Sequence, residues 1–193
     1  MRLFILARHG ESTLNVERRI NGNPSVEVAL SERGEEEARR LGEELAHIPI
    51  DVCVHTRFGR TLQTARLALS GRDIPFEVDP DVDDIDVGDL EGQTIEEYRA
   101  WKRAHERNDA FPGGESLDAA ALRYARAFRR LTERNERVTL VVAHEIAVRY
   151  AVNGAAGSEE LDAPTHDIRN AAPYLFDDQT LKRAAGRIEE LIG

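Results

Sequence analysis

The sequence lacks features that define several classes of protein. It contains one cysteine, Cys53, and two lysines, Lys102 and Lys182. One cysteine excludes a disulfide framework and a multi-cysteine zinc site, and its neighbours Val52 and Val54 indicate a thiol on a buried strand. The Gly-x-x-x-x-Gly-Lys segment of a nucleotide P-loop is absent, which excludes that class of nucleotide-binding protein.

Long apolar runs and an excess of positive charge are absent as well. No run approaches the roughly 20 residues of a membrane-spanning helix, and Leu3–Ala7 is too short for the apolar core of a signal peptide. The formal net charge of -10 repels nucleic acids and acidic membranes. We therefore expect a cytoplasmic protein that binds neither. A few arginines that converge in a cleft can still bind a small anion.

The length of 193 residues, with 41% apolar residues, is sufficient for one domain with its own core. Strands and helices alternate along the chain, which predicts an α/β fold. We expect a three-layer sandwich in which helices flank a mostly parallel central sheet. One domain is predicted over residues 1–193, with a short helical insertion over about residues 93–115.

The apolar pattern locates the individual elements. Buried strands are predicted at Leu3–Ala7, Val52–Val54 and Val138–Ala143, and further strands at Phe76–Val78 and around Ala172–Phe176. Helices are predicted after Ser31 up to Pro49, over Thr61–Leu69, from Thr94 to about Asn108, after Ser116, from Ile146 to about Asn153, and in the tail to Ile192. The acidic, glycine-containing stretch Asp79–Gly92 is predicted as a loop.

Polar residues follow three of the predicted buried strands. The sequence reads Arg8-His9-Gly10-Glu11 after the first, His55-Thr56-Arg57 with Arg60 one turn later after the second, and His144-Glu145 after the late strand. Ligands bind beyond the carboxyl ends of the strands in sheets of this kind. Two histidines and two or three arginines are therefore expected to converge, a combination that suits a phosphate.

The chemistry of a phosphoryl group explains this combination. Guanidinium groups form bidentate hydrogen bonds that an ammonium cannot reproduce, which assigns phosphate binding to Arg8 and Arg60. An imidazole between two arginines has a lowered pKa, stays neutral near pH 7 and can attack phosphorus. We therefore predict His9 as the nucleophile. The alternative, a buried structural His9 beside a surface Arg8, is disfavoured because three strand ends converge.

These motifs resemble those of the histidine phosphatase superfamily, also called phosphoglycerate mutase-like proteins. The matching segments are Arg8-His9-Gly10-Glu11-Ser12 with Asn15, then Thr56–Ala65, then Pro112-Gly113-Gly114-Glu115-Ser116, and Val141-Val142-Ala143-His144. The similarity extends from the first strand to Asn170. In the second segment the family's phosphate ligand is the arginine before Thr61, so the resemblance assigns this role to Arg60 rather than Arg57.

The resemblance implies a phosphohistidine mechanism that needs neither a metal nor another cofactor. His9 would attack phosphorus while arginines and the second histidine stabilise the charge that develops on the equatorial oxygens. The catalytic residues implied are His9, Asp84, His144, Arg8 and Arg60. The substrate-binding residues implied are Arg8, Asn15, Gly22, Arg60 and His144.

A separate acid must protonate the leaving alcohol oxygen. The family carries this acid in the loop before a Gly-x-x-Glu-Gly element, which reads Gly88-Asp89-Leu90-Glu91-Gly92 here. The alignment places Asp84 at the acid position, with Asp83 and Asp86 as alternatives. Many relatives have glutamate at this position, and aspartate is one methylene shorter.

Glu145 is a second departure from the family pattern, which usually has glycine after the second histidine. A negative charge beside an anion site is unfavourable unless it points away or is paired. The sequence leaves the direction of this side chain open.

Metal-binding interpretations of the acidic run fail. Asp79, Asp81 and Asp83 are spaced as in a calcium loop, yet the sixth position is Asp84 instead of glycine and the twelfth is Leu90 instead of glutamate. A magnesium-dependent phosphatase with an aspartate nucleophile would need a strong apolar strand before the run. The remaining histidines lack zinc spacing.

We therefore predict a histidine acid-type phosphatase that hydrolyses a small phosphorylated metabolite. A cofactor-dependent phosphoglycerate mutase is the runner-up, because family mutases carry a longer insertion with an Arg-Arg pair that the segment from Gly92 to Pro112 lacks. A third hypothesis is a low-activity relative that binds a phosphorylated ligand. The sequence names neither the substrate nor the oligomeric state, and a homodimer stays open.

Overall fold

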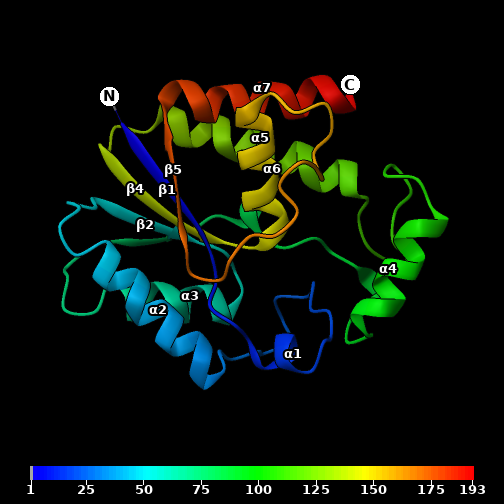
Figure 1. The fold of residues 1–193 in the computed structure, drawn as a ribbon, viewed down its shortest axis with the longest axis horizontal. Helices are drawn as coiled ribbons and strands as arrows, with labels where there is room; N and C mark the ends of the chain where they lie inside the picture. The colour runs from blue at the N-terminus through cyan, green and yellow to red at the C-terminus, as the bar shows by residue number, and fades with distance from the viewer. Residues whose placement is uncertain (1) are drawn as a thin grey trace.

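A five-stranded sheet forms the middle layer of the computed structural model, which describes residues 2–193 (Figure 1). The strands lie in the order β3-β2-β4-β1-β5. Their bounds are β1 Leu3–Arg8, β2 Val52–His55, β3 Phe76–Val78, β4 Val138–Ala143 and β5 Pro173–Asp177. All neighbours run parallel except β5, which pairs antiparallel with β1. The predicted mostly parallel sheet is confirmed.

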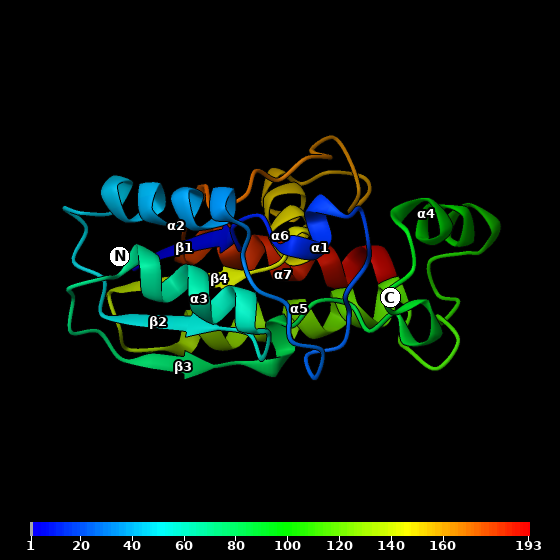
Figure 2. The same ribbon diagram turned by 90° about the horizontal axis from the view of Figure 1, so that it is seen from below.

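Helices cover both faces of the sheet and complete the three layers (Figures 1 and 2). One face carries α2 (Glu32–Glu44) and α3 (Gly59–Ala68), and the other carries α5 (Leu117–Glu133), α6 (Glu145–Ala156) and α7 (Asp178–Ile192). The short α1 (Thr13–Val16) lies beyond the end of β1, and α4 (Ile95–Ala104) stands to one side of the sandwich. Within residues 2–193, the helices are too short or too polar to cross a membrane.

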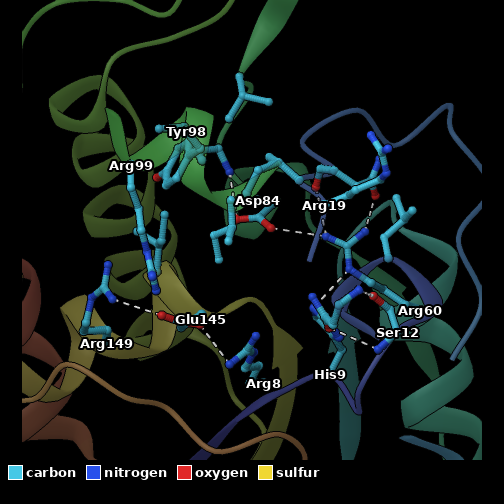
Figure 3. Close-up of a pocket in the computed structure, with 18 of the residues that line it drawn as sticks. Arg8, His9, Ser12, Arg19, Arg60, Asp84, Tyr98, Arg99, Glu145 and Arg149 are labelled. Carbon is cyan, nitrogen blue, oxygen red and sulfur yellow. Dashed lines mark hydrogen bonds and ion pairs between the residues drawn. The ribbon is translucent and has the colours of Figure 1, made fainter. Parts of the chain in front are cut away.

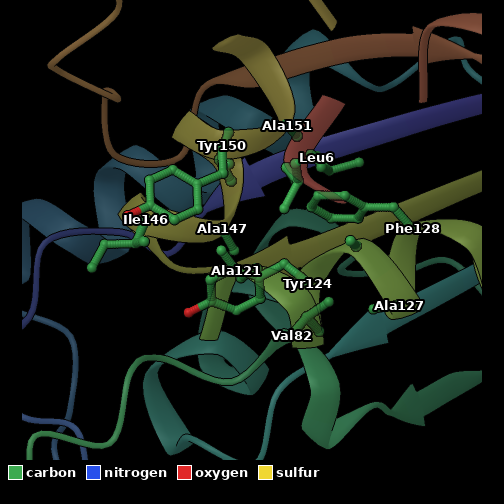
Figure 4. Close-up of a cluster of buried hydrophobic side chains, with 14 of the residues drawn as sticks. Leu6, Val82, Ala121, Tyr124, Ala127, Phe128, Ile146, Ala147, Tyr150 and Ala151 are labelled. Carbon is green, nitrogen blue, oxygen red and sulfur yellow. The ribbon is translucent and has the colours of Figure 1, made fainter. Parts of the chain in front are cut away.

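The central strand β1 is buried on both faces, as its uninterrupted apolar run predicted. Phe4 and Leu6 pack with α5 and α6 in a large cluster that includes Tyr124, Phe128 and Tyr150 (Figure 4). The alternate residues of β1 pack on the other face, against α2, α3 and Cys53. Burial raises the pKa of the Cys53 thiol to about 12, which makes it a core residue rather than a nucleophile.

Most predicted helix starts are found, but two helix ends differ. Ser31, Thr94 and Ser116 each cap the helix that follows them. Helix α4 ends at Ala104 rather than near Asn108: His105 is already extended, and Arg107 beyond it pairs with Asp118. Helix α2 ends at Glu44, before Ile48, and Arg72 donates to the carbonyls of Leu45 and Ile48 beyond that end.

The predicted loop Asp79–Gly92 contains two short 3-10 turns, Pro80–Val82 and Gly88–Leu90. Its backbone lies against the segment around Gly114: the Cβ of an alanine at Gly88 would come within 2.1 Å of the Pro112 carbonyl. The loop is thus closely packed, and it faces the carboxyl ends of β1, β2 and β4.

Candidate active site

Three strand ends bring polar side chains together at the carboxyl edge of the sheet, where Arg8, His9 and Arg60 line one cleft (Figure 3). Arg8 is the last residue of β1 and His9 follows it, the fully buried His144 follows β4, and Arg60 lies in the first turn of α3, just after β2. The His9 and His144 rings are 5.3 Å apart and both are buried. The convergence expected from the sequence is therefore present in the structure.

The tautomer of His9 follows from its hydrogen bonds. Its Nδ1 lies 2.7 Å from the carbonyl oxygen of Gly10, which can only accept, so Nδ1 carries the proton. Nε2 therefore has the lone pair, and it accepts a hydrogen bond of 3.0 Å from Nε of Arg60. Burial, Arg60 and Arg8 lower the pKa of His9 well below its usual value. This lowered pKa favours the neutral ring, in which Nε2 carries the lone pair.

A chain of hydroxyl groups orients His144. Its Nε2 lies 3.0 Å from Oγ1 of Thr56, which lies 2.8 Å from Oγ1 of Thr61, and Thr61 donates to the carbonyl of Phe58 at 2.8 Å. Because the chain ends at a carbonyl, Nε2 of His144 is its donor. Nδ1 then faces Arg60, whose terminal nitrogen lies 3.2 Å away. Burial and the charge of Arg60 lower the pKa of His144.

Arg60 connects the groups of the cleft, and its side chain is only 4% exposed. Besides the two histidines, it donates to the side chain and, at 3.2 Å, to the carbonyl of Asn21. A terminal nitrogen also lies 3.2 Å from Oδ2 of Asp84. A rigid, permanently charged fork is thereby fixed beside Nε2 of His9, where a phosphoryl group would need it.

Of the three candidate acids, only Asp84 lies in the cleft. Its Oδ2 is 3.4 Å from Nδ1 of His144, and burial raises the pKa of its carboxyl despite the opposing charge of Arg60. Asp83 is committed elsewhere, since it accepts from the backbone and side chain of Arg57 at 2.9 and 2.5 Å. The side chain of Asp86 accepts from the amide of Gly88 at 2.9 Å.

Glu145 is paired with arginine on both sides. One carboxylate oxygen lies 2.8 Å from Arg8 and the other lies 3.0 Å from Arg149. Arg8 also donates to the carbonyl of Ile168 at 3.0 Å. The question left open by the sequence is thereby answered: Glu145 lines the cleft, and its charge is compensated.

Asn15 and Gly22 occupy different positions relative to the cleft. Asn15 lines it, and because its Oδ1 accepts from the Ser12 amide at 3.0 Å, its free group is the Nδ2 donor. Gly22 is not among the residues that line the cleft, and its amide donates to Glu91 at 2.7 Å. A Cβ at Gly22 would come within 2.3 Å of the Ile85 carbonyl, so this glycine permits close packing of two loops. Its contact with substrate stays a prediction.

Sequence reasoning missed Asn21, the neighbour of Gly22. Glu91 accepts from the side chain of Asn21 at 2.7 Å and from the amide of Asn23 at 3.0 Å, which holds Asn21 against Arg60. In the sequence, the Gly-x-x-Glu-Gly element that contains Glu91 indicates the position of the candidate acid, but it does not indicate the contact between Glu91 and Asn21.

The sequence motifs also do not assign four other cations of the cleft to the substrate site. They are Arg19, Arg99, Lys102 and Arg149. Arg149 follows Glu145 by four residues, and this spacing on one helix face could have indicated their ion pair. Arg99 and Lys102 come from α4, whose position relative to the sheet is not encoded in local sequence patterns.

Comparison with known proteins agrees with the fold and the motifs. The sequence model of the histidine phosphatase superfamily (branch 1) matches residues 4–184. The chain is 32% identical to the probable phosphoglycerate mutase GpmB of Salmonella choleraesuis (strain SC-B67), over 97% of this chain and 91% of that protein. It is 31% identical to the adenosylcobalamin/alpha-ribazole phosphatase of Escherichia coli (strain K12), over 75% of this chain and 74% of that protein.

A solved structure gives the same result for the fold. The alpha-ribazole phosphatase from Shigella flexneri has a TM-score of 0.80 and 26% sequence identity, over 91% of this chain and 90% of that chain. The fold is thus phosphoglycerate mutase-like. The chain belongs to the histidine phosphatase superfamily (branch 1), which confirms the resemblance drawn from its motifs and supports a phosphatase or mutase enzyme.

Proposed function

We propose that this chain is a metal-independent phosphomonoesterase that acts through a phosphohistidine on His9. The observation that carries the proposal is the tautomer of His9, which lines the cleft: Nδ1 is held by the carbonyl of Gly10, so the lone pair is on Nε2, where Arg60 donates to it. A neutral imidazole beside a buried guanidinium is suited to attack a phosphoryl group and to stabilise the charge that develops on it.

In the first half-reaction, Nε2 of His9 forms a bond to phosphorus and the bond from phosphorus to the ester oxygen breaks. Arg60 and Arg8 hold the equatorial oxygens, and the Nδ2 donor of Asn15 adds to them. Neutral His144 offers these oxygens no free N–H, because its Nε2 donates to Thr56 and its Nδ1 accepts from Arg60, so its role is to orient Arg60. The leaving oxygen takes the proton of the Asp84 carboxyl. The raised pKa of Asp84 keeps this proton available, and its side chain lines the cleft.

In the second half-reaction, a water molecule attacks the phosphohistidine. The Asp84 carboxylate accepts a proton from the water as the oxygen bonds to phosphorus, and the electron pair of the phosphorus–nitrogen bond returns to Nε2 of His9. Inorganic phosphate is released, and both residues regain their starting protonation states. The net reaction consumes one ester and one water and needs no cofactor.

The test is turnover of p-nitrophenyl phosphate by the wild type and by His9→Ala, each with EDTA. We expect EDTA to leave the wild-type rate unchanged and His9→Ala to lose at least about a thousandfold. The matched control is His47→Ala, because His47 is exposed and lies outside the cleft. Alkaline quench followed by mass spectrometry should find a phosphoryl group on His9. Activity lost on chelation, or retained by His9→Ala, would contradict the proposal.

A mutase is the second candidate, favoured by the similarity to a probable phosphoglycerate mutase over nearly the whole chain. A mutase passes the phosphoryl group to a second substrate position instead of to water. Phosphorus NMR of 3-phosphoglycerate, with and without 2,3-bisphosphoglycerate, separates the two. Release of inorganic phosphate supports the phosphatase, whereas accumulation of 2-phosphoglycerate supports the mutase. Binding of these esters without either product supports the low-activity ligand-binding hypothesis.

A further inference from the structure

Arg123 of helix α5 donates to the main chain of the loop that carries Asp84. Its terminal nitrogens lie 3.0 Å from the carbonyl oxygen of Asp83 and 3.3 Å from that of Asp84. A further contact, at 3.1 Å, joins Arg123 to the carbonyl oxygen of Asp81. In each of these hydrogen bonds the charged guanidinium donates and a neutral carbonyl accepts. The side chain of Arg123 is only 14% exposed, so water competes little for the same donors.

Two of these carbonyls determine the direction of the Asp84 side chain. The carbonyl of Asp83 belongs to the peptide group before the Cα of Asp84, and the carbonyl of Asp84 belongs to the peptide group after it. Peptide groups are planar. One guanidinium that binds both of them therefore restricts the backbone dihedral angles of Asp84 and, with them, the direction of its Cβ. The carboxylate of Asp84 in turn accepts from the amide of Ile85 at 3.0 Å.

Glu115 connects Arg123 to the next part of the same loop. Its carboxylate pairs with Arg123 and accepts from the amide of Asp86 at 3.0 Å. The amide of Glu115 donates to the carbonyl of Asp86 at 2.9 Å. The backbone is therefore held on both sides of Asp84, by Arg123 up to residue 84 and by Glu115 at residue 86.

Arg123 acts from outside the cleft. Asp84 lines the cleft and also a second cavity, so its loop lies between the two. Arg123 lines the second cavity, together with Arg57 and Glu115, and is not among the residues that line the cleft. In the proposed reaction it therefore touches neither the substrate nor the reacting atoms. Any effect of Arg123 on the reaction must pass through the position of Asp84.

A second arginine of α5 binds the same loop in a different way. Arg130 follows Arg123 by seven residues, which is about two helical turns and keeps it on the same helix face. It pairs with the carboxylates of Asp79 and Asp81 at 2.9 and 2.6 Å, and its side chain is 48% exposed. Arg130 thus binds side chains at the start of the loop, whereas Arg123 binds the peptide groups next to Asp84.

We propose that Arg123 is a positioning residue for the acid: by holding the carbonyls of Asp83 and Asp84, it directs the Asp84 carboxyl toward the oxygen that leaves phosphorus. Transfer of a proton to this oxygen needs a separation of about 2.6–3.2 Å. A small shift of the loop therefore slows protonation of the leaving group much more than it slows the attack by His9. This inference rests on the proposed function and deepens it.

The test compares esters whose leaving groups differ in their need for a proton. p-Nitrophenolate leaves without one, whereas the alkoxide of glycerol needs one, and phenolate is intermediate. We would measure kcat/KM for p-nitrophenyl phosphate, phenyl phosphate and glycerol 3-phosphate in the wild type, Arg123→Gln and Arg123→Lys. Arg130→Gln is the matched control, because it removes an arginine of the same helix that binds the same loop. Urea denaturation defines conditions in which each variant is folded.

We expect Arg123→Gln to lower kcat/KM about a hundredfold for glycerol 3-phosphate but less than about fivefold for p-nitrophenyl phosphate, with phenyl phosphate between them. Arg123→Lys keeps the charge and part of the hydrogen bonding, so it should recover part of the loss. Arg130→Gln should lose stability but keep the wild-type ratios between the esters. An equal loss for all three esters in Arg123→Gln would show a merely structural role and overturn the inference.

A milder variant covers the case in which Arg123→Gln fails to fold. Glu115→Gln keeps an acceptor for the amide of Asp86 and removes the charge that pairs with Arg123. We expect a smaller loss, about tenfold for glycerol 3-phosphate and less than about twofold for p-nitrophenyl phosphate. Equal losses for both esters in Glu115→Gln would overturn the inference in the same way.

A double variant tests whether Arg123 acts through Asp84. If it does, Arg123→Gln should change kcat/KM for glycerol 3-phosphate by less than about twofold when Asp84→Asn is already present. Independent effects would multiply, and a double variant that shows the full product of the two losses would contradict the inference.

Amide hydrogen exchange separates this inference from the proposed function, because it needs no turnover. The amide of Ile85, which donates to Asp84, should exchange about tenfold faster in Arg123→Gln than in the wild type, and at the wild-type rate in Arg130→Gln. If the wild type hydrolyses none of the esters, the proposed function fails, and the exchange rates still decide whether Arg123 holds the loop. If hydrolysis depends on His9 but neither the ester ratios nor the exchange of Ile85 change in Arg123→Gln, only the role of Arg123 is refuted.

Discussion

The carboxylate of Glu145 lies 2.8 Å from the guanidinium of Arg8, the arginine that precedes the predicted nucleophile. From Glu145 the charges alternate outward: Arg149 pairs with Asp162, and Asp162 pairs with Arg107 beyond α4. Glu145, which departs from the family pattern, thus neutralises part of the positive charge that the cleft presents to a phosphate. Through these ion pairs it also connects the cleft to the segment after α4.

Replacement of Glu145 by glutamine should strengthen anion binding. Gln keeps the shape and one acceptor for Arg8 or Arg149, but it removes the charge that competes with phosphate. We expect the inhibition constant for inorganic phosphate to fall by about tenfold, the equivalent of roughly 1.4 kcal/mol. Competitive inhibition assays with p-nitrophenyl phosphate measure it. The matched control is Glu36→Gln at an exposed position of α2. An equal fall of the inhibition constant in Glu36→Gln, or weaker inhibition of Glu145→Gln by phosphate, would refute the idea that Glu145 competes with phosphate.

The pH dependence of activity should have an acidic optimum. The proposed mechanism needs neutral His9 and protonated Asp84. Burial lowers the pKa of His9 and raises the pKa of Asp84. The rate kcat/KM therefore falls at low pH as His9 gains a proton and falls at higher pH as Asp84 loses one. Profiles of kcat/KM for glycerol 3-phosphate should show both limbs.

Two variants test the assignment of the alkaline limb. Asp84→Asn should remove that limb and reduce hydrolysis of glycerol 3-phosphate by about 10²–10⁴-fold, but affect p-nitrophenyl phosphate less, because p-nitrophenolate leaves without a proton. Glu145→Gln should move the limb to lower pH, since the charge of Glu145 helps to raise the pKa of Asp84. A limb that persists in Asp84→Asn would assign it to another group.

Much of the fold could be predicted from the sequence because local patterns determine it. The doubly buried run of β1, the caps Ser31, Thr94 and Ser116, and the alternation of strands with helices each depend on neighbouring residues. The grouping of His9, Arg60 and His144 followed from parallel topology, which brings strand ends to one edge.

The remaining features depend on contacts between distant segments. The partners of Glu145, the position of Asn21 against Arg60, and the placement of α4 over the cleft involve residues far apart in the chain. The contacts of α4 are of the same kind: Trp101 packs on Phe111, whereas Tyr98 both stacks on Phe111 and lines the cleft.

Gly34 shows how a residue that is unfavourable locally is required by a distant contact. It lies in the first turn of α2, where glycine weakens a helix. A Cβ added at Gly34, however, would lie only 2.0 Å from the carbonyl oxygen of Glu11. The start of α2 therefore packs directly on the backbone that follows His9. The contact is close on both sides, because a Cβ added at Gly10 would lie 2.3 Å from the carbonyl oxygen of Gly34.

Gly34→Ala should therefore destabilise the protein, whereas alanine at a helical glycine with free space should stabilise it. We expect Gly34→Ala to lower the free energy of unfolding by about 1–3 kcal/mol, because two backbone segments must separate. Gly186→Ala in α7 is the matched control: its nearest neighbour would be a terminal nitrogen of Arg129 at 4.0 Å, and we expect a gain of about 0.5–1 kcal/mol. Urea denaturation midpoints at an unchanged m-value measure both. Equal shifts for the two variants would show that helix propensity alone, and not the contact between α2 and the backbone after His9, decides the outcome at Gly34.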